Sequence, residues 1–315
     1  MNLIFINGTM GVGKTTVCRA LQKKLPPCVF ADGDVFWNMY PFLVNEQTKK
    51  MVLDNAGAAL SNFIQSGQFK NILFCWVMHE KSIIKELLAR IPSRPLRFFL
   101  FTLTADKKIV EKRLRQDIDA GRRSEGVLAR SEERAQHYRE MLSYKIDTTL
   151  LSAEGAADLI AATVAGKTGL LPYKETRRLT KAGRAVREEV FMQEQGFAGE
   201  FDARDEDCTH MVFYKGGEPA ACCRYFATDQ PGVFAVGRIA VRKKFRGLGY
   251  GRTVLRAAEA CARREGAKAM TLSAQVRAQG FYERCGYTAE GATYEEEGVP
   301  HITMRKKILF LLPRL

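Results

Sequence analysis

Short apolar runs alternate with helix-like segments along the first half of the chain. The runs are rich in Leu, Ile, Phe and Val, and the segments between them repeat their apolar positions with helical spacing. This alternation is typical of an α/β fold with a doubly wound parallel sheet. The expected strands are Asn2–Ile6, Cys28–Ala31, Asn71–Met78, Arg97–Leu103 and Lys145–Thr149, and the expected helices are Thr16–Leu25, Glu46–Gln65, Asp106–Ala120, Ser131–Met141 and Ala153–Ala165.

The second half of the chain does not repeat this order. A helix comes first, two strands then form a hairpin through Lys215–Glu218, and a longer strand runs into a glycine-rich loop and a second helix. Gly166–Pro172 contains two glycines and one proline and predicts the boundary, giving domains 1–166 and 173–315 with a linker at 167–172. The expected helices are Ala182–Gln195 and Arg252–Glu265, and the expected strands are His210–Tyr214, Pro219–Ala227, Val233–Val241 and Met270–Ala274.

Length and composition agree with two cores. The chain has 315 residues, of which 46% are hydrophobic, and two domains are the natural expectation at this length. No apolar run reaches membrane-spanning length, so no membrane partner is expected. Since the sequence starts directly on the first strand, it predicts no leader segment and a cytoplasmic protein.

Cysteine usage and charge narrow the function classes. The eight cysteines are scattered without a C-x-x-C pair, which argues against a zinc site and a disulfide scaffold. The net charge of +14 permits a nucleic-acid-binding protein, but no basic stripe with interleaved aromatic residues and no nucleic-acid motif is present. Phosphorylated cofactors explain the positive charge more simply, so no nucleic-acid partner is expected.

A glycine-rich loop joins the first strand to the first helix. Gly8–Thr15 fits G-x-x-x-x-G-K-[ST] at every fixed position, in the strand–loop–helix context that this phosphate-binding motif requires. Backbone N–H groups and the helix N-terminus would hold the phosphates, Lys14 would reach the β- and γ-phosphates, and Thr15 would bind Mg²⁺. The predicted ATP-binding residues in this segment are Gly8, Gly11, Val12, Gly13, Lys14, Thr15 and Thr16.

Acidic residues follow the second expected strand. Asp32 and Asp34 flank Gly33, where carboxylates could bind Mg²⁺ and orient or deprotonate an acceptor hydroxyl. An Asp-Gly turn that caps a helix explains the same residues equally well. His79 and Glu80 follow the next strand, at the edge where ligands bind in such sheets, and a helix-start role is slightly favoured for His79.

The segment 1–166 resembles the AAA-type, P-loop nucleotide-kinase-like branch that includes shikimate, gluconate and adenylate kinases. The resemblance implies ATP and Mg²⁺ as cofactors, Mg²⁺ held by Thr15 and Asp32, and catalytic roles for Lys14 and Asp34. It also implies a mobile lid after the basic helix, from which Arg122 would contact the transferring phosphate. The third strand lacks the usual terminal Asp, so both a kinase and a nucleotide sensor remain open.

A second glycine-rich loop, Arg246–Gly251, follows the long strand and is also an anion cradle. It has no Gly-Lys-Ser/Thr and does not have the spacing of a dinucleotide fingerprint. It matches the [RQ]-x-x-G-x-[GA] loop of GNAT acetyltransferases, and Gln279–Tyr287 resembles their F-Y-x-x-x-G-[FY] segment. Val186–Gly196, the acidic residues after it, and Val299–Met304 resemble the ElaA-type branch, so the resemblance covers about residues 173–308.

The GNAT resemblance implies an α+β domain with a mixed, mostly antiparallel sheet. It implies direct acetyl transfer from acetyl-CoA to an amine, with Tyr282 as the general acid that protonates the leaving thiolate; a packed core tyrosine is the alternative. Glu194, Asp202 and His301 are the acceptor candidates, although the acidic run could equally be a solvated loop. The implied acetyl-CoA contacts are Ile239, Ala240 and Val241 for pantetheine and Arg246, Gly247, Leu248, Gly249, Tyr250 and Gly251 for pyrophosphate.

Together these patterns predict a bifunctional enzyme, a GNAT N-acetyltransferase of a small amine fused to an ATP-dependent small-molecule kinase. An acetyltransferase regulated by a nucleotide-sensing P-loop domain is the alternative among enzymes, and a basic nucleic-acid-binding protein is the alternative of another class. The partners expected are small acceptors that carry an amine or a hydroxyl. Nothing in the sequence indicates the acceptors or the oligomeric state.

Overall fold

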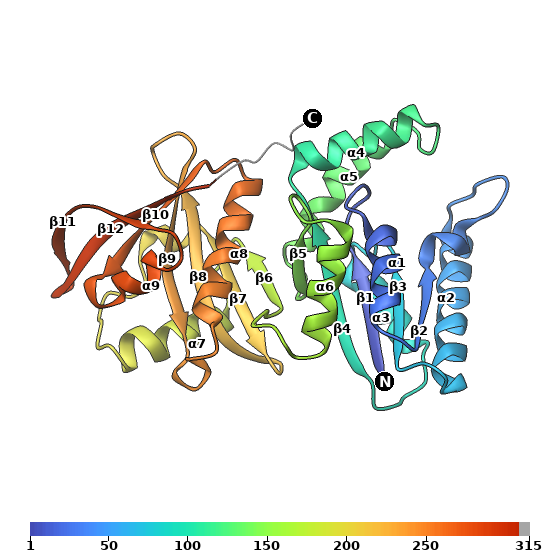
Figure 1. Ribbon diagram of the computed structural model, residues 1–315, viewed down its shortest axis with the longest axis horizontal. Helices are drawn as coiled ribbons and strands as arrows, with labels where there is room; N and C mark the ends of the chain where they lie inside the picture. The colour runs from blue at the N-terminus through green and yellow to red at the C-terminus, as the bar shows by residue number, and fades with distance from the viewer. Residues whose placement is uncertain (309–315) are drawn as a thin grey trace. The chain divides into compact units, whose positions relative to one another are not determined.

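The chain divides between residues 168 and 169 into two units, each built on its own sheet (Figure 1). The computed structural model describes residues 1–308 of the 315, so the last residues of the predicted second domain lie outside the described part. The end of the predicted linker is attached to the second unit, because the carbonyl of Gly169 accepts from Thr253 Oγ1 at 2.8 Å and that of Pro172 from the N–H of Tyr214 at 2.9 Å.

A five-stranded sheet forms the centre of the first unit, Met1–Thr168. Every strand pairing in it is parallel and the strand order is β2-β3-β1-β4-β5, as a doubly wound fold requires. This confirms the predicted fold class of the first half. The strands are β1 (Asn2–Asn7), β2 (Cys28–Asp32), β3 (Asn71–Cys75), β4 (Arg97–Thr104) and β5 (Tyr144–Asp147).

Helices cover the first sheet because its central strands are apolar toward both faces. Residues 3–7 of β1 are buried, and Leu3 and Phe5 share one core with residues of two helices, α2 and α3. Another helix, α1, buries Val17, Cys18 and Leu21 and packs against α6. The helices are α1 (Lys14–Lys24), α2 (Glu46–Ser66), α3 (Lys81–Ala89), α4 (Lys107–Asp119), α5 (Val127–Ala135) and α6 (Ala153–Val164).

Two predicted elements of the first half differ from the structure. The strand expected over Asn71–Met78 ends at Cys75, and Met78 has a positive φ of 38°, which no strand accommodates. The helix expected over Ser131–Met141 begins four residues earlier as α5 and gives way to a 3₁₀ turn at Gln136–Tyr138. The early start places Val127 and Ser131, one turn apart, on the buried face of the helix.

A seven-stranded sheet in the order β11-β12-β10-β9-β8-β7-β6 forms the second unit. Only β9 and β10 pair in parallel, so the sheet is mixed and mostly antiparallel, as the resemblance implied. The sequence did not predict β6, β11 or β12. The strands are β6 (Tyr173–Thr176), β7 (Thr209–Lys215), β8 (Glu218–Ala227), β9 (Val233–Val241), β10 (Ala269–Gln275), β11 (Thr288–Glu296) and β12 (Val299–Lys307).

Two helices bury apolar side chains against the second sheet. The longer one, α8 (Tyr250–Arg264), places Val254, Leu255 and Ala258 in the main core. The shorter one, α7 (Lys181–Arg187), contributes Val186 to a smaller core over β8 and β9. It continues as a π-helical segment, η3 (Glu188–Gln193), instead of the single α-helix predicted to Gln195. A short helix, α9 (Gln279–Glu283), follows β10.

Candidate functional site

Glycines at left-handed backbone angles shape the first phosphate loop, between β1 and α1. Gly8, Gly11 and Gly13 have φ values of 142°, 82° and 95°. A Cβ on Gly8 would lie 2.5 Å from the carbonyl oxygen of Leu103, and one on Gly11 would lie 2.8 Å from Cγ of Leu114. Gly8 and Gly11 therefore meet a steric limit besides the backbone one, which explains why the motif has glycine there.

The amide groups of this loop are available to an anion. The N–H groups of residues 11–15 donate no hydrogen bond to the described chain, and α1 begins at Lys14. Lys14 Nζ donates to the carbonyls of Gly8 at 2.9 Å and Thr9 at 3.0 Å, so the cation lies over its own loop. Burial lowers the pKa of Lys14, while the thiol of Cys75 and the carboxyl of Asp34 act in the opposite direction. Free amides and a folded-back lysine form a cradle for phosphate oxygens.

The two residues predicted to bind Mg²⁺ lie together. Thr15 Oγ1 donates to Asp32 Oδ2 at 2.7 Å. Asp32 Oδ1 accepts from the N–H of Asp34 at 3.1 Å and caps the 3₁₀ turn η1 (Gly33–Trp37). The turn-and-cap explanation of Asp32 is therefore correct, and the same side chain also reaches the P-loop. A hydroxyl and a carboxylate at hydrogen-bond distance are hard oxygen donors of the kind that Mg²⁺ takes alongside phosphate oxygens, so this pair fits the ion.

Asp34 lies one turn further along, beside the lysine. Loss of solvent raises the pKa of Asp34, and the positive charge of Lys14 opposes that rise. The backbone in front of it is fixed, because a Cβ on Gly33 would lie 2.5 Å from Cγ of Trp76. Asp34 is exposed and within electrostatic reach of Lys14, so it stays a candidate to accept a proton from a hydroxyl.

The turn between α4 and α5 carries the predicted lid arginine. Arg122 is exposed and its guanidinium lies on Asp117, with Nη2 2.9 Å from Oδ1. Arg123, which was not predicted, also reaches Asp117, at 3.3 Å, and its charge lowers the pKa values of both Lys14 and Asp34. Of the two arginines in this turn, Arg123 is therefore the one whose charge acts on Lys14 in the phosphate loop.

Ser131 connects α5 to the phosphate loop by hydrogen bonds, and no motif in the sequence predicts this contact. Its Oγ donates to the carbonyl of Met10 at 3.0 Å and lies 2.9 Å from Thr9 Oγ1, which in turn donates to the Ser131 carbonyl at 2.7 Å. All three contacts are buried.

His79 lies two residues before α3, in agreement with the favoured helix-start role. Its ring is edge-on to that of His137.

In the second unit, β9 and β10 separate part-way along their length (Figure 1). Their parallel pairing covers only Val233–Ala235 of β9 and ends at Thr271 of β10. From there on β9 pairs with β8 alone, so the backbone of Ile239–Val241 has no strand on its β10 side. The three residues predicted to contact pantetheine thus lie at an opening in the sheet, with no strand beside them on the β10 side.

The second glycine loop lies directly beyond this opening. Gly247 and Gly249 have φ values of 79° and 77°, and a Cβ on either would meet nothing within 4 Å. The N–H groups of residues 247–249 donate no hydrogen bond to the described chain, and α8 begins at Tyr250. Open space, free amides and a helix N-terminus together form an anion cradle.

Arg246 at the start of this loop is paired with Glu194. Its guanidinium meets the carboxylate at 2.5 and 2.7 Å, while its Nε donates to the carbonyl of Val241 at 2.9 Å. The structure therefore places Glu194 beside the second glycine loop, with its carboxylate bound to Arg246. The adjacent Gln195 accepts from Gln275 Nε2 at 3.0 Å, so residues 194 and 195 link the two strand ends that border the opening.

Three residues of the acidic run after Gln195, Glu200, Asp202 and Asp205, belong to an ion network with arginines. Asp202, predicted to recognise the acceptor, receives two bonds from Arg224 at 2.6 Å and one from Arg238 at 3.2 Å. Burial alone would raise the pKa of Asp205, but hydrogen bonds from Arg187 and Arg224 outweigh it and hold that pKa at about 2. Glu200, Asp202 and Asp205 are therefore paired with arginines, whereas Glu206 and Asp207 of the same run are exposed, as the solvated-loop alternative expects. Arg238 has a positive φ of 53° at a bulge in β9, and the network anchors it.

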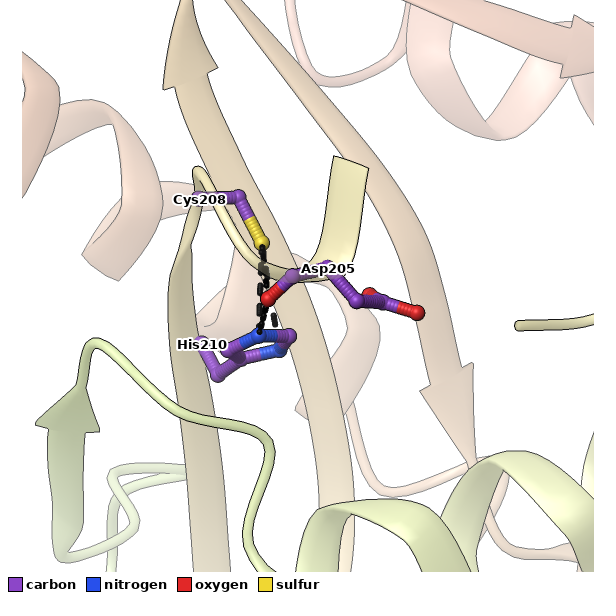
Figure 2. A group of neighbouring side chains, drawn as sticks. All are labelled: Asp205, Cys208 and His210. Atoms are coloured by element: carbon purple, nitrogen blue, oxygen red, sulfur yellow. Dashed lines mark hydrogen bonds between the residues drawn. The ribbon is translucent and has the colours of Figure 1, made fainter. Parts of the chain in front are cut away.

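Asp205, Cys208 and His210 come close enough to suggest a metal site (Figure 2). His210 Nε2 lies 2.9 Å from the backbone carbonyl of Asp205 and 3.3 Å from Cys208 Sγ. The Asp205 carboxylate is directed away from both side chains and is bonded to Arg187 and Arg224. The guanidiniums of Arg187 and Arg224 would repel a metal cation. Burial raises the pKa of the Cys208 thiol to about 11, so the thiol stays protonated and is a poor metal ligand. We therefore assign no metal here.

Tyr282 and His301 complete the predicted residues. Tyr282 on α9 packs edge-on against Phe281 and Tyr287, and its hydroxyl makes no hydrogen bond within residues 1–308. Burial raises the pKa of Tyr282 to about 12, so the phenol stays protonated at neutral pH. His301 on β12 is buried, with Nδ1 2.8 Å from the carbonyl of Val299.

Comparison with known proteins agrees with this architecture. Residues 175–287 match the acetyltransferase (GNAT) family, and residues 4–138 match an AAA domain family. A Bacillus subtilis protein named as an acetyltransferase is 32% identical over 127 residues, 39% of this chain and 85% of that protein. The uncharacterised N-acetyltransferase YjcF of Bacillus subtilis is 35% identical over 124 residues, 38% of this chain and 87% of that protein.

Two solved structures are also similar to part of this chain. An N-acetyltransferase from Lactobacillus plantarum is 34% identical with a TM-score of 0.40, covering 44% of this chain and 99% of that one. Escherichia coli ElaA is 26% identical with a TM-score of 0.39, covering 44% of this chain and 99% of that one. No helix within residues 1–308 is long and apolar enough to cross a membrane. Through its second unit the chain belongs to the GNAT acetyltransferase family, and an AAA-type domain precedes that unit.

Proposed function

We propose that the second unit transfers the acetyl group of acetyl-CoA to a small amine. One observation supports the proposal. The edge of β9 at Ile239–Val241, which has no strand on its β10 side, leads directly into the loop with the free amides of residues 247–249. A pantetheine amide chain would pair with the strand edge as an added strand does, and the pyrophosphate would occupy the loop. Arg246 would exchange Glu194 for the phosphate, since an ion pair this exposed contributes only about 0–1 kcal/mol.

Tyr282 would protonate the CoA sulfur as the C–S bond breaks. A phenol with a pKa of about 12 carries its proton throughout the neutral range, and its hydroxyl has no competing acceptor within the described chain. The rings of Phe281 and Tyr287 pack edge-on against Tyr282 and orient its phenol. Acetyl-CoA, when bound, supplies the activated acyl group, and the remaining task of the protein is to position the amine.

Thiol release from acetyl-CoA in the presence of a panel of primary amines tests this proposal. Tyr282→Phe keeps the ring packing and should lower kcat about 100-fold while leaving the Kd for acetyl-CoA unchanged. A Tyr282→Phe enzyme as fast as the wild type would remove Tyr282 from the acid role. Failure of the wild-type protein to bind acetyl-CoA at all would refute the whole proposal.

For the first unit we propose ATP binding and phosphoryl transfer to a small hydroxyl acceptor. Lys14, the Thr15–Asp32 pair and Asp34 support it, since together they offer a phosphate cradle, two magnesium donors and a base. The AAA-type family match supports nucleotide binding in general. The absence of a Walker-B acid at Cys75, where β3 ends, keeps a nucleotide sensor as the competing proposal.

Lys14→Ala separates the two proposals for the first unit. If the unit is a kinase, the variant should lose ATP-dependent phosphorylation of the acceptor and keep its acetyl transfer. If the unit is a sensor, wild-type acetyl transfer should depend on ATP, and the variant should lose that dependence. Lys24→Ala, at the far end of the same helix, is the matched control and should change neither activity.

A further inference from the structure

One face of the second sheet is polar where β10, β11 and β12 lie side by side. Gln275 of β10 and Tyr294 of β11 are both directly opposite His301 of β12, so the three side chains share a face. Ser273 lies two residues before Gln275 on β10 and Glu296 two residues after Tyr294 on β11, so both side chains point to the same face. The opposite face of β10 and β12 is apolar and packs into the main core through Leu272, Ala274, Ile302 and Met304.

This polar face lies beside the opening in the sheet. Gln275 is the last residue of β10, four positions beyond Thr271, where the pairing with β9 ends. Its side chain bonds to Gln195, in the segment that runs along the same opening. A side chain on this face at the level of Gln275 is therefore next to the place where the thioester of a bound cofactor would lie.

His301 stands on this face in a defined tautomer. It is only 8% exposed, yet it lies among polar side chains, with its ring stacked on that of Tyr294 at 6.3 Å. Nδ1 lies 2.8 Å from the Val299 carbonyl, which can only accept, so Nδ1 carries the proton. In the neutral ring Nε2 then has a free lone pair, and it has no hydrogen-bond partner within residues 1–308. A buried imidazole with one nitrogen fixed and the other unpartnered is arranged as a base.

On the same face as His301, a chain of hydrogen bonds ends on the carboxylate of Glu296. Tyr294 Oη donates to Ser273 Oγ at 2.6 Å, and Ser273 Oγ donates to Glu296 Oε2 at 2.9 Å. Both hydroxyl protons are thereby directed toward Glu296, so the carboxylate is held in place by neutral donors. No salt bridge to Glu296 occurs in the described chain, in contrast to Glu194 and Asp202, which are each paired with arginine. Its negative charge remains available to a cation.

We propose that His301 is the general base of acetyl transfer and that Glu296 binds the ammonium group of the acceptor, which makes the acceptor a cationic primary amine. This inference rests on the proposed acetyltransferase function. It replaces Glu194 and Asp202 by Glu296 as the residue that recognises the positive charge.

The protons balance as follows. An ammonium group loses two protons when it becomes an amide. The first passes to His301 Nε2 and on to solvent, which frees the nitrogen lone pair to form the C–N bond to the thioester carbon. As the C–S bond breaks, Tyr282 protonates the sulfur, and the second proton from nitrogen restores Tyr282 through solvent.

Two small nucleophiles distinguish base catalysis from a structural role. Propylamine is cationic at neutral pH and needs a base, whereas hydroxylamine is largely neutral and does not. His301→Ala should lower kcat with propylamine about 100-fold or more, lower it much less with hydroxylamine, and leave the Kd for acetyl-CoA unchanged. Added imidazole should restore part of the propylamine rate. Equal losses with both nucleophiles, or no rescue, would overturn the role of His301, and His137→Ala in the first unit is the control.

The role of Glu296 is tested by comparing its substitution with the same substitution at the neighbouring Glu295. Glu296→Gln should raise KM for propylamine about tenfold and leave KM for hydroxylamine unchanged, whereas Glu295→Gln, one residue away on the other face of β11, should change neither. Equal effects of the two substitutions would refute the ammonium site. If wild-type protein binds acetyl-CoA but these values do not respond, the inference fails and the proposed function stands.

A measurement on the unmodified chain covers the case in which His301→Ala does not fold. Long-range ¹H–¹⁵N spectra of the full-length protein report the tautomer of each of its four histidines, and His301→Gln identifies the signal of His301. A proton on Nδ1 is expected. A proton on Nε2 in the neutral ring would overturn the assignment of that nitrogen as the base.

Discussion

Single residues in the two phosphate loops are constrained for different reasons. Gly8 is limited by a neighbouring carbonyl and by its backbone angle, whereas Gly249 has open space around it and is limited only by its φ of 77°. For Gly249 the penalty of a side chain is therefore the left-handed conformation, about 1–2 kcal/mol. That difference makes Gly249 the cleaner position at which to test the loop.

Gly249→Ala should weaken acetyl-CoA binding about tenfold, because the loop can relieve the strain by moving its amides out of the cradle. Isothermal titration calorimetry with acetyl-CoA measures the change. Gly216→Ala in the β7–β8 turn is the control, since Gly216 has a φ of 60° and nothing within 4 Å of its Cβ. It should lower stability by a similar amount and leave the Kd unaltered; a shared loss of affinity would contradict the role of the loop.

The second prediction at this scale concerns acid. The folded-state pKa of Asp205, about 2, lies below the usual 3.8, so Asp205 stabilises the fold above pH 4 and loses that effect as the pH falls toward 2. The contribution is about 2 kcal/mol. Urea unfolding between pH 5 and 3 should show stability falling more steeply in the wild type than in Asp205→Asn. Parallel pH curves for the two proteins would contradict the ion network as drawn.

A contiguous motif predicts residues that act together, whereas no motif predicts contacts between residues on distant elements. Lys14, Thr15 and the glycines follow from one contiguous pattern, and Asp32 from the strand that ends beside it. The charge of Glu194 and Asp202 predicts acceptor recognition, because the sequence shows the carboxylates and not their partners. Their arginine partners lie 52 and 22 residues away on other elements, and no spacing rule connects them.

Among the elements, α5 is tied to the chemistry of the first unit through one serine. Two buried hydrogen bonds and a close contact between hydroxyl oxygens join Ser131 to Thr9 and Met10, so the helix and the phosphate loop stabilise each other. Since α5 follows the turn that carries Arg122 and Arg123, this attachment also fixes one end of the predicted lid.

Ser131→Ala should lower the stability of the first unit by about 1–3 kcal/mol, because it leaves the Met10 carbonyl and the Thr9 hydroxyl without the serine hydroxyl. Differential scanning calorimetry should show the transition of that unit shifted and the other transition unchanged. The exposed Ser124→Ala, in the preceding turn, is the control. No shift, or a shift equal to that of Ser124→Ala, would mean that the loop does not depend on α5.

At the scale of elements the periodicity gave most of the fold, and its failures have local causes. Strands that are buried on both faces, such as β1 and β3, are continuous apolar runs and were found. The strand β11 is exposed along its whole length and has no apolar face to detect. The π-helical segment η3 differs from an α-helix by one residue per turn, which an apolar pattern of two turns does not resolve.

For the whole molecule, two separate sheets with separate cores imply two folding transitions. Each ligand then stabilises the unit that binds it: at 100 times its Kd the gain is about 2.7 kcal/mol. We expect acetyl-CoA to raise the Tm of one transition and ATP with Mg²⁺ that of the other in scanning calorimetry. An acetyl-CoA experiment that shifts neither transition would refute the cofactor proposed for the second unit. A single transition that both ligands shift would show that the units unfold together.

The exposed strand β11 also bears on how copies of this protein behave in concentrated solution. It is the last strand of its sheet, so one row of its backbone groups has no neighbouring strand in the described chain, and such a row is a template for another copy. A bulge between Glu290 and Tyr294 bends the strand, and Glu295–Glu297 line its end. If two such edges came together, the carboxylates of the two copies would repel each other. The charges of the proposed acceptor site therefore also disfavour aggregation through this edge.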